Sequence, residues 1–246
     1  MNWFDGRLAA FDIETTGTSI ESDRIVTAAV SLVGGGEGSA SRSWLVNPGV
    51  AIPAEATAVH KITNEMAQSE GVPAAEAVEE ITTLLAQALE NEIPVVAFNA
   101  RFDLTILDRE ARRHGVVPLV DRVGGPDGLL VIDPYVLDKQ FNKYRKGRRN
   151  LAILCEDFTV PLTDAHAADA DALAAARLAW RMASRNDVLG HMELFELHEL
   201  QIQWAAEQAA ELQDYFASQG RIEQIEGTWP VVPFDRSLQT VDQLAA

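Results

Sequence analysis

The segment LAAFDIETTG, residues 8–17, decides the fold and carries the first candidate functional residues. Its beginning, LAAFDI, is a short and mostly apolar run, which predicts a buried β-strand. Asp12 and Glu14 come at the end of that run, and residues two apart in a strand point to the same face. Two neighbouring carboxylates repel each other unless a cation lies between them. The pair therefore predicts a site for a hard divalent ion such as Mg²⁺ or Mn²⁺.

Two further carboxylates come at the ends of other predicted elements. Asp103 follows the apolar run VVAF, residues 95–98, where the chain turns from a strand into a helix. Asp171 lies at the start of another predicted helix, and His166 lies just before it. A neutral imidazole can accept a proton from water at physiological pH. Each residue has an ordinary alternative, since acidic residues favour helix N-termini and a surface histidine needs no special role.

The pattern along the rest of the chain predicts a sheet covered by helices. IVTAAVSLV (25–33) and SRSWLV (41–46) are expected strands, and the glycines between them favour a hairpin. VVAF and LLVID (129–133) are the fourth and fifth expected strands. Helices are expected at 73–94, 102–114, 135–141, 151–158, 167–184 and 187–218. This order predicts an α/β fold with a mixed five-stranded sheet flanked by helices.

The overall charge limits the classes of partner. A formal net charge of −17 argues against a tight, nonspecific grip on long duplex DNA, because such affinity comes mainly from neutralising phosphates. Six of the twenty basic residues nevertheless lie between residues 139 and 149, so one basic strip survives in an acidic chain. The ordinary alternative for this strip is a solvated helix and loop.

The apolar pattern limits the compartment. No basic stretch followed by an apolar run comes after Met1, and no run of about 18 apolar residues occurs. We therefore expect a soluble, unexported, cytoplasmic protein that does not bind a membrane. Cys155 lies in an apolar helical pattern and is expected to be buried and unreactive.

Three segments, FDIETTG, NARFD and HAADAD, resemble the three motifs of the DEDDh (DnaQ-like) exonucleases. This family belongs to the ribonuclease H-like superfamily and includes the proofreading epsilon subunit of bacterial DNA polymerase III. The resemblance covers about residues 7–184. It implies a ribonuclease H-like fold and a metal-dependent 3′–5′ exonuclease. Such an enzyme releases nucleoside 5′-monophosphates from single-stranded or frayed 3′ ends, in a role such as proofreading or DNA repair.

The resemblance also assigns residues to roles. It implies that two divalent metal ions, Mg²⁺ or Mn²⁺, are held by Asp12, Glu14, Asp103 and Asp171. It implies His166 as general base, and Ala167 excludes the tyrosine branch of the family. The candidate substrate-binding residues are Thr15, Thr16, His60, Ile62, Asn99 and Phe102. Phe98 departs from the family, in which many members have histidine, and we expect it to alter substrate contacts more than chemistry.

Beyond residue 184 the resemblance gives no guidance. We expect an exonuclease domain at 1–184 and a helical C-terminal extension with an irregular tail at 185–246. The helix at 187–218 is expected to pack on the parent domain, while a polymerase contact and a homodimer are alternatives, and the oligomeric state stays open. Residues 239–244 are a poor candidate for a clamp-binding peptide.

Two other functions stay open at this level. One is an oligoribonuclease or RNA 3′-trimming enzyme with the same catalytic residues, because recognition of the terminal 2′ position depends on geometry that a sequence does not show. The other is a noncatalytic adaptor that binds nucleic acid or a polymerase. Loss of a carboxylate would be its usual signature, and all four are present.

Overall fold

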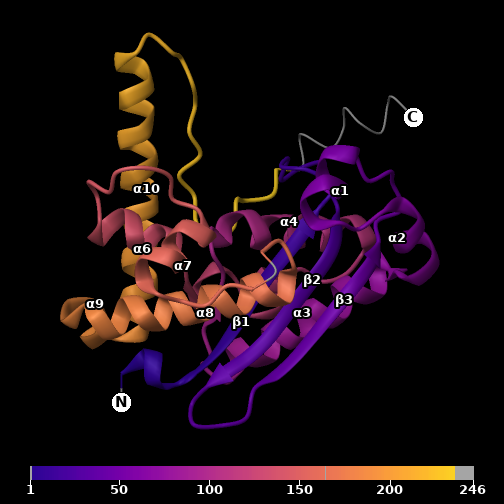
Figure 1. Ribbon diagram of the computed structural model, residues 1–246, viewed down its shortest axis with the longest axis horizontal. Coiled ribbons are helices and arrows are strands. Elements are labelled where there is room, and N and C mark those ends of the chain that lie inside the picture. The colour runs from indigo at the N-terminus through magenta and orange to yellow at the C-terminus, as the bar shows by residue number, and fades with distance from the viewer. Residues whose placement is uncertain (1, 164, 236–246) are drawn as a thin grey trace.

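A mixed six-stranded sheet forms the centre of the molecule, which the computed structural model describes over residues 2–163 and 165–235 (Figure 1). The strands are β1 (Arg7–Thr15), β2 (Ile25–Gly34), β3 (Ala40–Asn47), β4 (Val72–Pro73), β5 (Val95–Val96) and β6 (Val131–Ile132). Their order across the sheet is β4-β3-β2-β1-β5-β6. β1, β2 and β3 pair antiparallel, whereas β5 and β6 join parallel to β1 and β4 joins parallel to β3. The predicted α/β class is confirmed.

All five expected strands are present, and β4 is a sixth that the sequence did not predict. β4 contains Pro73, which has no N–H to donate to a ladder, so such a strand is confined to the edge of a sheet. The expected strands at 95–98 and 129–133 are each reduced to a two-residue ladder. The residues of both strands are nevertheless fully buried, although β6 lies at the edge of the sheet.

Helices cover both faces of the sheet. They are α1 (Ala54–His60), α2 (Asn64–Glu70), α3 (Ala74–Glu90), α4 (Ala100–His114), α5 (Leu119–Arg122), α6 (Pro134–Phe141), α7 (Leu151–Phe158), α8 (Ala168–Arg185), α9 (Asp187–His191) and α10 (Leu194–Ser218), with 3₁₀ turns η1 (Trp3–Asp5) and η2 (Pro126–Gly128). α8 crosses β1 and β2 on one face, and α3 and α4 lie behind the sheet (Figure 1). Coverage on both sides explains why β1 begins with a continuous apolar run.

The prediction of one continuous helix over 187–218 is wrong. The chain forms α9 and α10, and Met192 and Glu193 between them have extended backbone. Gly190 lies near the end of α9, where glycine weakens a helix. A Cβ atom at this position would lie 3.0 Å from the Phe4 ring, so the close approach of η1 favours glycine here. α1, α2 and α5 are additional short helices that the apolar pattern did not reveal.

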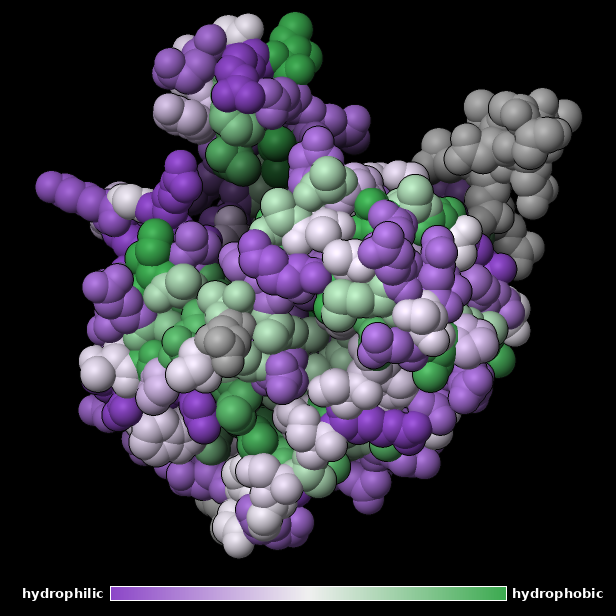
Figure 2. Space-filling model, turned by 45° about the vertical axis from the view of Figure 1, so that its right-hand side comes forward, coloured by the Kyte–Doolittle hydropathy of each residue, from purple (hydrophilic) through white to green (hydrophobic). Residues whose placement is uncertain are grey.

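α10 packs against β6, which confirms the expected contact of this helix with the parent domain. His198 accepts a hydrogen bond at Nδ1 from the Val131 N–H at 3.1 Å. Gln201 accepts the Asp133 N–H at 2.7 Å and donates to the Val131 carbonyl at 3.0 Å. The remainder of α10 projects beyond the body, and the surface around its far end is mostly hydrophilic (Figures 1 and 2).

The chain after α10 returns to the body as an irregular tail, residues 219–235, as expected. Trp229 is buried, and the Val232 N–H donates to Thr105 Oγ1 at 3.0 Å on α4. Arg109 of α4 donates to the carbonyls of Val232 and Pro233 at 3.1 and 3.2 Å. The tail is thus tied to the helix that carries Asp103. The 239–244 segment lies outside the described residues.

Cys155 and the apolar content of the helices were also the subject of predictions. Cys155 is 1% exposed, as expected, and burial raises the pKa of its thiol to about 11. Within the described parts of the chain, none of the helices combines the length and the apolar composition that crossing a lipid bilayer requires.

Candidate active site

Four carboxylates from three elements meet beside the end of β1. Asp12 and Glu14 come from β1, Asp103 from the first turn of α4 and Asp171 from the first turn of α8. Burial raises the pKa of Asp12 well above its usual value, and the charges of Asp103, Asp171 and Glu14 raise it further. Burial, then the charge of Asp171, raises the pKa of Glu14 to about 7. The carboxylates that the sequence predicted to form one site are therefore within electrostatic reach of one another.

Local backbone features place the carboxylates on the first two elements. The pairing register of β1 with β2 shifts between Glu14 and Thr15, and such bulges often re-aim side chains beside active sites. α4 begins after Asn99, which has a left-handed conformation with φ of 64°. Asp103 is buried one turn later and accepts a hydrogen bond from the Ile13 N–H at 3.1 Å. This bond fixes α4 against the strand between Asp12 and Glu14.

The third motif brings His166 to the same place. The His166 N–H donates to Asp171 Oδ2 at 3.1 Å, and His166 has a positive φ of 70°. One ligand atom each of Glu14, His166 and Asp171 lies within 4.8 Å of the others. His166 is exposed, whereas Asp171 is buried, so the imidazole borders the carboxylate group from the solvent side.

This donor set fits divalent cations. Asp171 Oδ1 is buried and has no hydrogen-bond partner among the described residues. Burial raises the pKa of Asp171 as well, and hydrogen bonding to His166 only partly opposes that rise. Buried carboxylates that repel one another and leave an oxygen unpaired are stabilised when a cation binds them, and hard divalent ions prefer oxygen ligands.

The predicted threonine contacts have structural partners of their own. Thr15 Oγ1 donates to the Gly17 carbonyl at 2.5 Å. Thr16 Oγ1 donates to Asp23 at 2.6 Å and accepts the Arg24 N–H at 3.0 Å. Both hydroxyls therefore shape the loop after β1. Their contribution to a substrate contact stays a prediction.

His60 and Ile62 lie beside His166, as expected for neighbours of one bound group. All three line a pocket of about 310 Å³, together with Trp44 of β3. His60 accepts the Ile62 N–H at Nδ1, 3.1 Å away, and its buried Nε2 has no hydrogen-bond partner within the described residues. Burial lowers the pKa of His60, which favours the neutral imidazole. Trp44 was not predicted as part of this site.

Asn99 and Phe102 are placed differently. Asn99 lines a separate cleft, which also includes Asp133 and Arg101, and does not line the pocket of His60. The Phe102 ring is half-buried and packs against the hydrophobic core. The structure therefore brings the four carboxylates, His166, His60 and Ile62 together, and puts Asn99 in the adjoining cleft.

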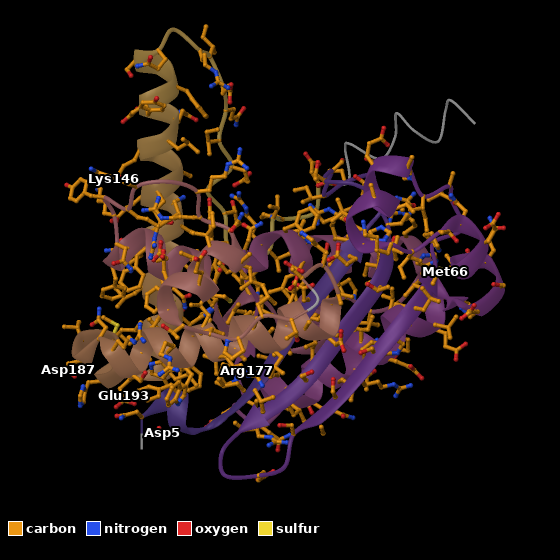
Figure 3. All side chains as sticks on the ribbon, viewed as in Figure 1. Asp5, Met66, Lys146, Arg177, Asp187 and Glu193 are labelled. Carbon is orange, nitrogen blue, oxygen red and sulfur yellow. The ribbon has the colours of Figure 1, made fainter. Side chains whose placement is uncertain are left out.

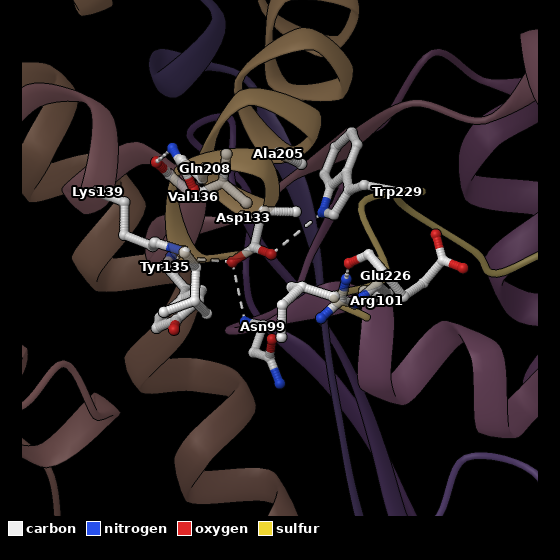
Figure 4. Close-up of a pocket in the computed structure, with 13 residues that line it drawn as sticks. Asn99, Arg101, Asp133, Tyr135, Val136, Lys139, Ala205, Gln208, Glu226 and Trp229 are labelled. Atoms are coloured by element: carbon white, nitrogen blue, oxygen red, sulfur yellow. Dashed lines mark hydrogen bonds between the residues drawn. The ribbon is translucent and has the colours of Figure 1, made fainter. Parts of the chain in front are cut away.

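Asp133, a buried carboxylate directly after β6, was not predicted as part of a site. Its Oδ1 accepts the N–H groups of Asn99 and Tyr135 at 2.9 Å, and its Oδ2 accepts the N–H of Trp229 Nε1 at 3.2 Å (Figure 4). The Ala100 N–H also donates to Oδ2, at 2.9 Å. Burial raises the pKa of Asp133 to about 6. The available signal was an Asp directly before Pro134, which is typical of a helix start.

Comparison with known proteins identifies the family. The RNase_T model, described as an exonuclease, matches residues 9–179. The PolC-type DNA polymerase III of Staphylococcus epidermidis is 29% identical over 196 residues, which are 78% of this chain and 13% of that protein. The corresponding protein of Halalkalibacterium halodurans is 29% identical over 194 residues, 77% of this chain and 12% of its own length. This chain therefore spans about an eighth of the length of these relatives.

Solved structures agree on the fold. Escherichia coli exonuclease I, solved with a dT13 oligonucleotide, has a TM-score of 0.61 and 19% identity, covering 75% of this chain and 42% of that one. Exonuclease I from Methylocaldum szegediense has a TM-score of 0.61 and 21% identity, covering 85% and 45%. The resemblance to DnaQ-like exonucleases is confirmed, and the site lies within the matched residues. The chain belongs to the RNase_T exonuclease family.

Proposed function

We propose that this chain is a metal-dependent 3′–5′ exonuclease that hydrolyses single-stranded nucleic acid to nucleoside 5′-monophosphates. The observation that supports it best is the meeting of four carboxylates beside β1, with His166 next to them. Membership in the exonuclease family supports the nuclease activity. The direction of cleavage, the strand state and the metal requirement are our proposal.

The four carboxylates hold two divalent ions, Mg²⁺ or Mn²⁺, in this proposal. When bound, such ions neutralise charge on the phosphate and make the attacking water more acidic. Backbone hydrogen bonds pre-orient two of the carboxylates, since the Ile13 N–H holds Asp103 and the His166 N–H holds Asp171. Pre-orientation matters because small misplacements of catalytic groups lower the rate strongly.

His166 acts as the general base. Its ring lies on the solvent side of the carboxylates, where an attacking water enters, and the neutral imidazole accepts the proton of that water. General base catalysis contributes about 10²–10⁴-fold to the rate. The hydrogen bond from the His166 backbone to Asp171 keeps the base beside the carboxylates during turnover.

The terminal nucleotide occupies the pocket of His60 and Ile62. Its volume of about 310 Å³ is in the range of small-ligand sites, which begins at about 300 Å³. We propose Thr15, Thr16 and Phe102 as further substrate contacts, and we expect Phe98, where many family members have histidine, to alter substrate contacts more than chemistry.

DNA is the preferred substrate in this proposal, because the curated relatives are DNA polymerases. The same relatives suggest a polymerase as a partner and proofreading or repair as a role. RNA 3′ trimming is the alternative, and the relative cleavage rates of DNA and RNA strands distinguish the two. We further propose an exonuclease domain at 1–184 followed by an extension, since the family match ends at residue 179.

The test is a cleavage ladder. Purified protein and an Asp12→Asn variant are incubated with 5′-labelled single-stranded DNA or RNA of equal sequence, in Mg²⁺, Mn²⁺ or EDTA. A ladder that shortens from the 3′ end, needs metal and disappears in the variant is the expected result. The strand that is cut faster gives the sugar preference. No cleavage of either strand in either metal would overturn the proposal in favour of a nucleic-acid-binding adaptor.

A further inference from the structure

A second cleft lies next to the carboxylates, between α6 and the C-terminal tail. This α6–tail cleft is lined by Asn99, Arg101, Asp133, Tyr135, Lys139 and Trp229, and α10 closes one side of it (Figure 4). Asn99 immediately precedes α4, whose first turn carries Asp103, and the charge of Asp133 in the cleft helps to raise the pKa of Asp103. The cleft therefore adjoins the carboxylate site and is built partly from the C-terminal extension.

Two cations reach this cleft without forming an ion pair among the described residues. Lys139 is half-buried and makes no ion pair with the described residues, and its ammonium nitrogen lies 5.1 Å from the centre of the Tyr135 ring. Arg101 donates to the carbonyl of Glu226 and likewise makes no ion pair in the described part of the chain. Burial lowers the pKa of Lys139, and the positive charges of Arg149 and Arg101 lower it further, while the charges of Asp133 and Glu211 partly oppose this shift.

The acidic groups around the cleft are already engaged. Asp133 is buried, and four N–H donors occupy its two oxygens. Glu226 accepts the Thr228 N–H at 2.6 Å, and its carboxylate points away from Lys139 (Figure 4). Glu211 is paired with Lys143. None of these acidic groups forms an ion pair with Lys139 or Arg101 among the described residues, so both cations keep N–H groups that an incoming anion can accept.

Two arginines of the basic strip form ion pairs within the protein. Arg145 and Arg149 both pair with the buried Asp138, and Arg145 also pairs with Asp157. These pairs hold the α6–α7 loop in place, so the strip as a whole is not an open phosphate-binding surface. Lys139 is the member of the strip that lines the α6–tail cleft.

We propose that the α6–tail cleft binds a backbone phosphate of the substrate strand, 5′ to the bond that is cut, through Lys139 and Arg101. The cavity is about 110 Å³, whereas about 10–15 Å³ measured in this way holds one water molecule. It has room for a phosphate group. The proposal rests on the proposed exonuclease function, because the carboxylate site fixes where the 3′ end lies.

The experiment measures binding, so that it does not depend on cleavage. Fluorescence anisotropy with 5′-labelled oligothymidylates of two to six nucleotides in EDTA gives the affinity at several salt concentrations. Each phosphate contact to a single strand contributes about 0.7 to the slope of log affinity against log salt. For the longer strands, Lys139→Gln is expected to lower this slope by about 0.7 and to weaken binding several-fold, and Lys139→Arg is expected to restore both.

Lys146→Gln is the matched control. Lys146 belongs to the same basic strip but is exposed on the α6–α7 loop at the outside of the molecule (Figure 3). This variant removes the same charge and should leave slope and affinity unchanged. Arg101→Gln tests the cleft from its other side and should resemble Lys139→Gln. Excess inorganic phosphate is added as a competitor, and little displacement of the strand is expected if the cleft recognises a phosphate within a chain.

The outcomes separate the two proposals. Equal slopes for wild type and Lys139→Gln, or equal losses in Lys139→Gln and Lys146→Gln, would exclude the phosphate site. Full displacement by inorganic phosphate at millimolar concentration would also exclude it, in favour of a free-anion site. A strand that binds through Lys139 but is not cut in Mg²⁺ or Mn²⁺ would support the phosphate site while the exonuclease proposal fails.

Discussion

Asp133 and the four carboxylates beside β1 lie in adjoining parts of this molecule. They differ in how completely hydrogen-bond donors of the protein surround their oxygens. Asp133 has both oxygens occupied by N–H donors from α4, α6 and the C-terminal tail. Asp171 has one buried oxygen without a partner among the described residues, and Asp12 lies among three other carboxylates that raise its pKa. The protein itself supplies donors for both oxygens of Asp133. The carboxylates beside β1 repel one another and need a bound cation to balance their charge.

This difference separates a structural role from a functional one. A buried carboxylate with a full set of donors stabilises the fold, and removing its charge leaves donors unsatisfied. Buried carboxylates that face one another destabilise the fold until a cation binds. The same substitution, Asp to Asn, should therefore have opposite effects on stability in the two places.

The largest effect is expected for Asp12→Asn. Turnover should fall by about 10⁴-fold, equivalent to about 5.5 kcal/mol of transition-state stabilisation, because a ligand of the cations is lost. The melting temperature of the metal-free protein near pH 7.5 should rise, since one member of a repelling group becomes neutral. Turnover assays and thermal unfolding in EDTA measure the two changes. A variant that is both active and less stable would contradict the assignment of Asp12.

His166→Ala should have the next largest effect. We expect a loss of turnover of about 10³-fold, within the range for a general base, with little change in stability because the ring is exposed. His191→Ala is the matched control, since His191 is an exposed histidine on α9, away from the carboxylates. Metal titration sharpens the result. Unchanged metal affinity supports a base, whereas a loss of affinity equal to the loss of turnover would make His166 a ligand.

Asp133→Asn should lower stability by about 3 kcal/mol, because the amide NH₂ group faces N–H donors and two hydrogen bonds to a charged acceptor are lost. Chemical denaturation measures the change. Asp127→Asn replaces an exposed aspartate on η2 and should change stability by less than about 0.5 kcal/mol. Equal stability of the two variants would mean that Asp133 does not hold α4, α6 and the tail together.

The smallest effect concerns the pH dependence of the metal-free protein. The pKa of Glu14 is raised from 4.5 to about 7, so the native state favours its protonated form. That contribution to stability is fully present below pH 4.5 and is lost as the pH rises through 7. Thermal unfolding in EDTA should show this loss, and Glu14→Gln should reduce it. Saturating Mg²⁺ should oppose the loss in the wild type. A steeper decline in Glu14→Gln than in wild type would contradict the raised pKa.

The carboxylate part of the candidate site follows from short sequence motifs, and the rest of the site does not. Asp12 and Glu14 share a face because strands have a period of two. Asp103 and Asp171 lie at the starts of helices and were assigned through the resemblance of their motifs to the exonuclease family. The sheet follows from the same apolar runs. Such patterns need information from only a few neighbouring residues, which is why the α/β class and five of the six strands were predicted.

The parts that were missed depend on contacts between distant residues. Asp133 and Trp229 are 96 positions apart, and nothing local to either residue indicates their hydrogen bond. β4 exists because Val72 meets Val46 of β3, and Val72 has no apolar run of its own. Likewise the basic strip gave no sign that Arg145 and Arg149 enclose Asp138. Long-range contacts of this kind determine where the C-terminal extension lies.

The side chains of His198 and Gln201 give α10 the role of an additional strand. β6 is the last strand on its side of the sheet, and such an edge exposes N–H and carbonyl groups that can pair with another molecule. The two side chains occupy those groups at Val131 and Asp133, and thereby end the sheet. α10 thus protects the edge of β6 from pairing with another copy of the chain. A fragment that stops at residue 184 should aggregate more readily than the whole chain, even if its carboxylates are intact.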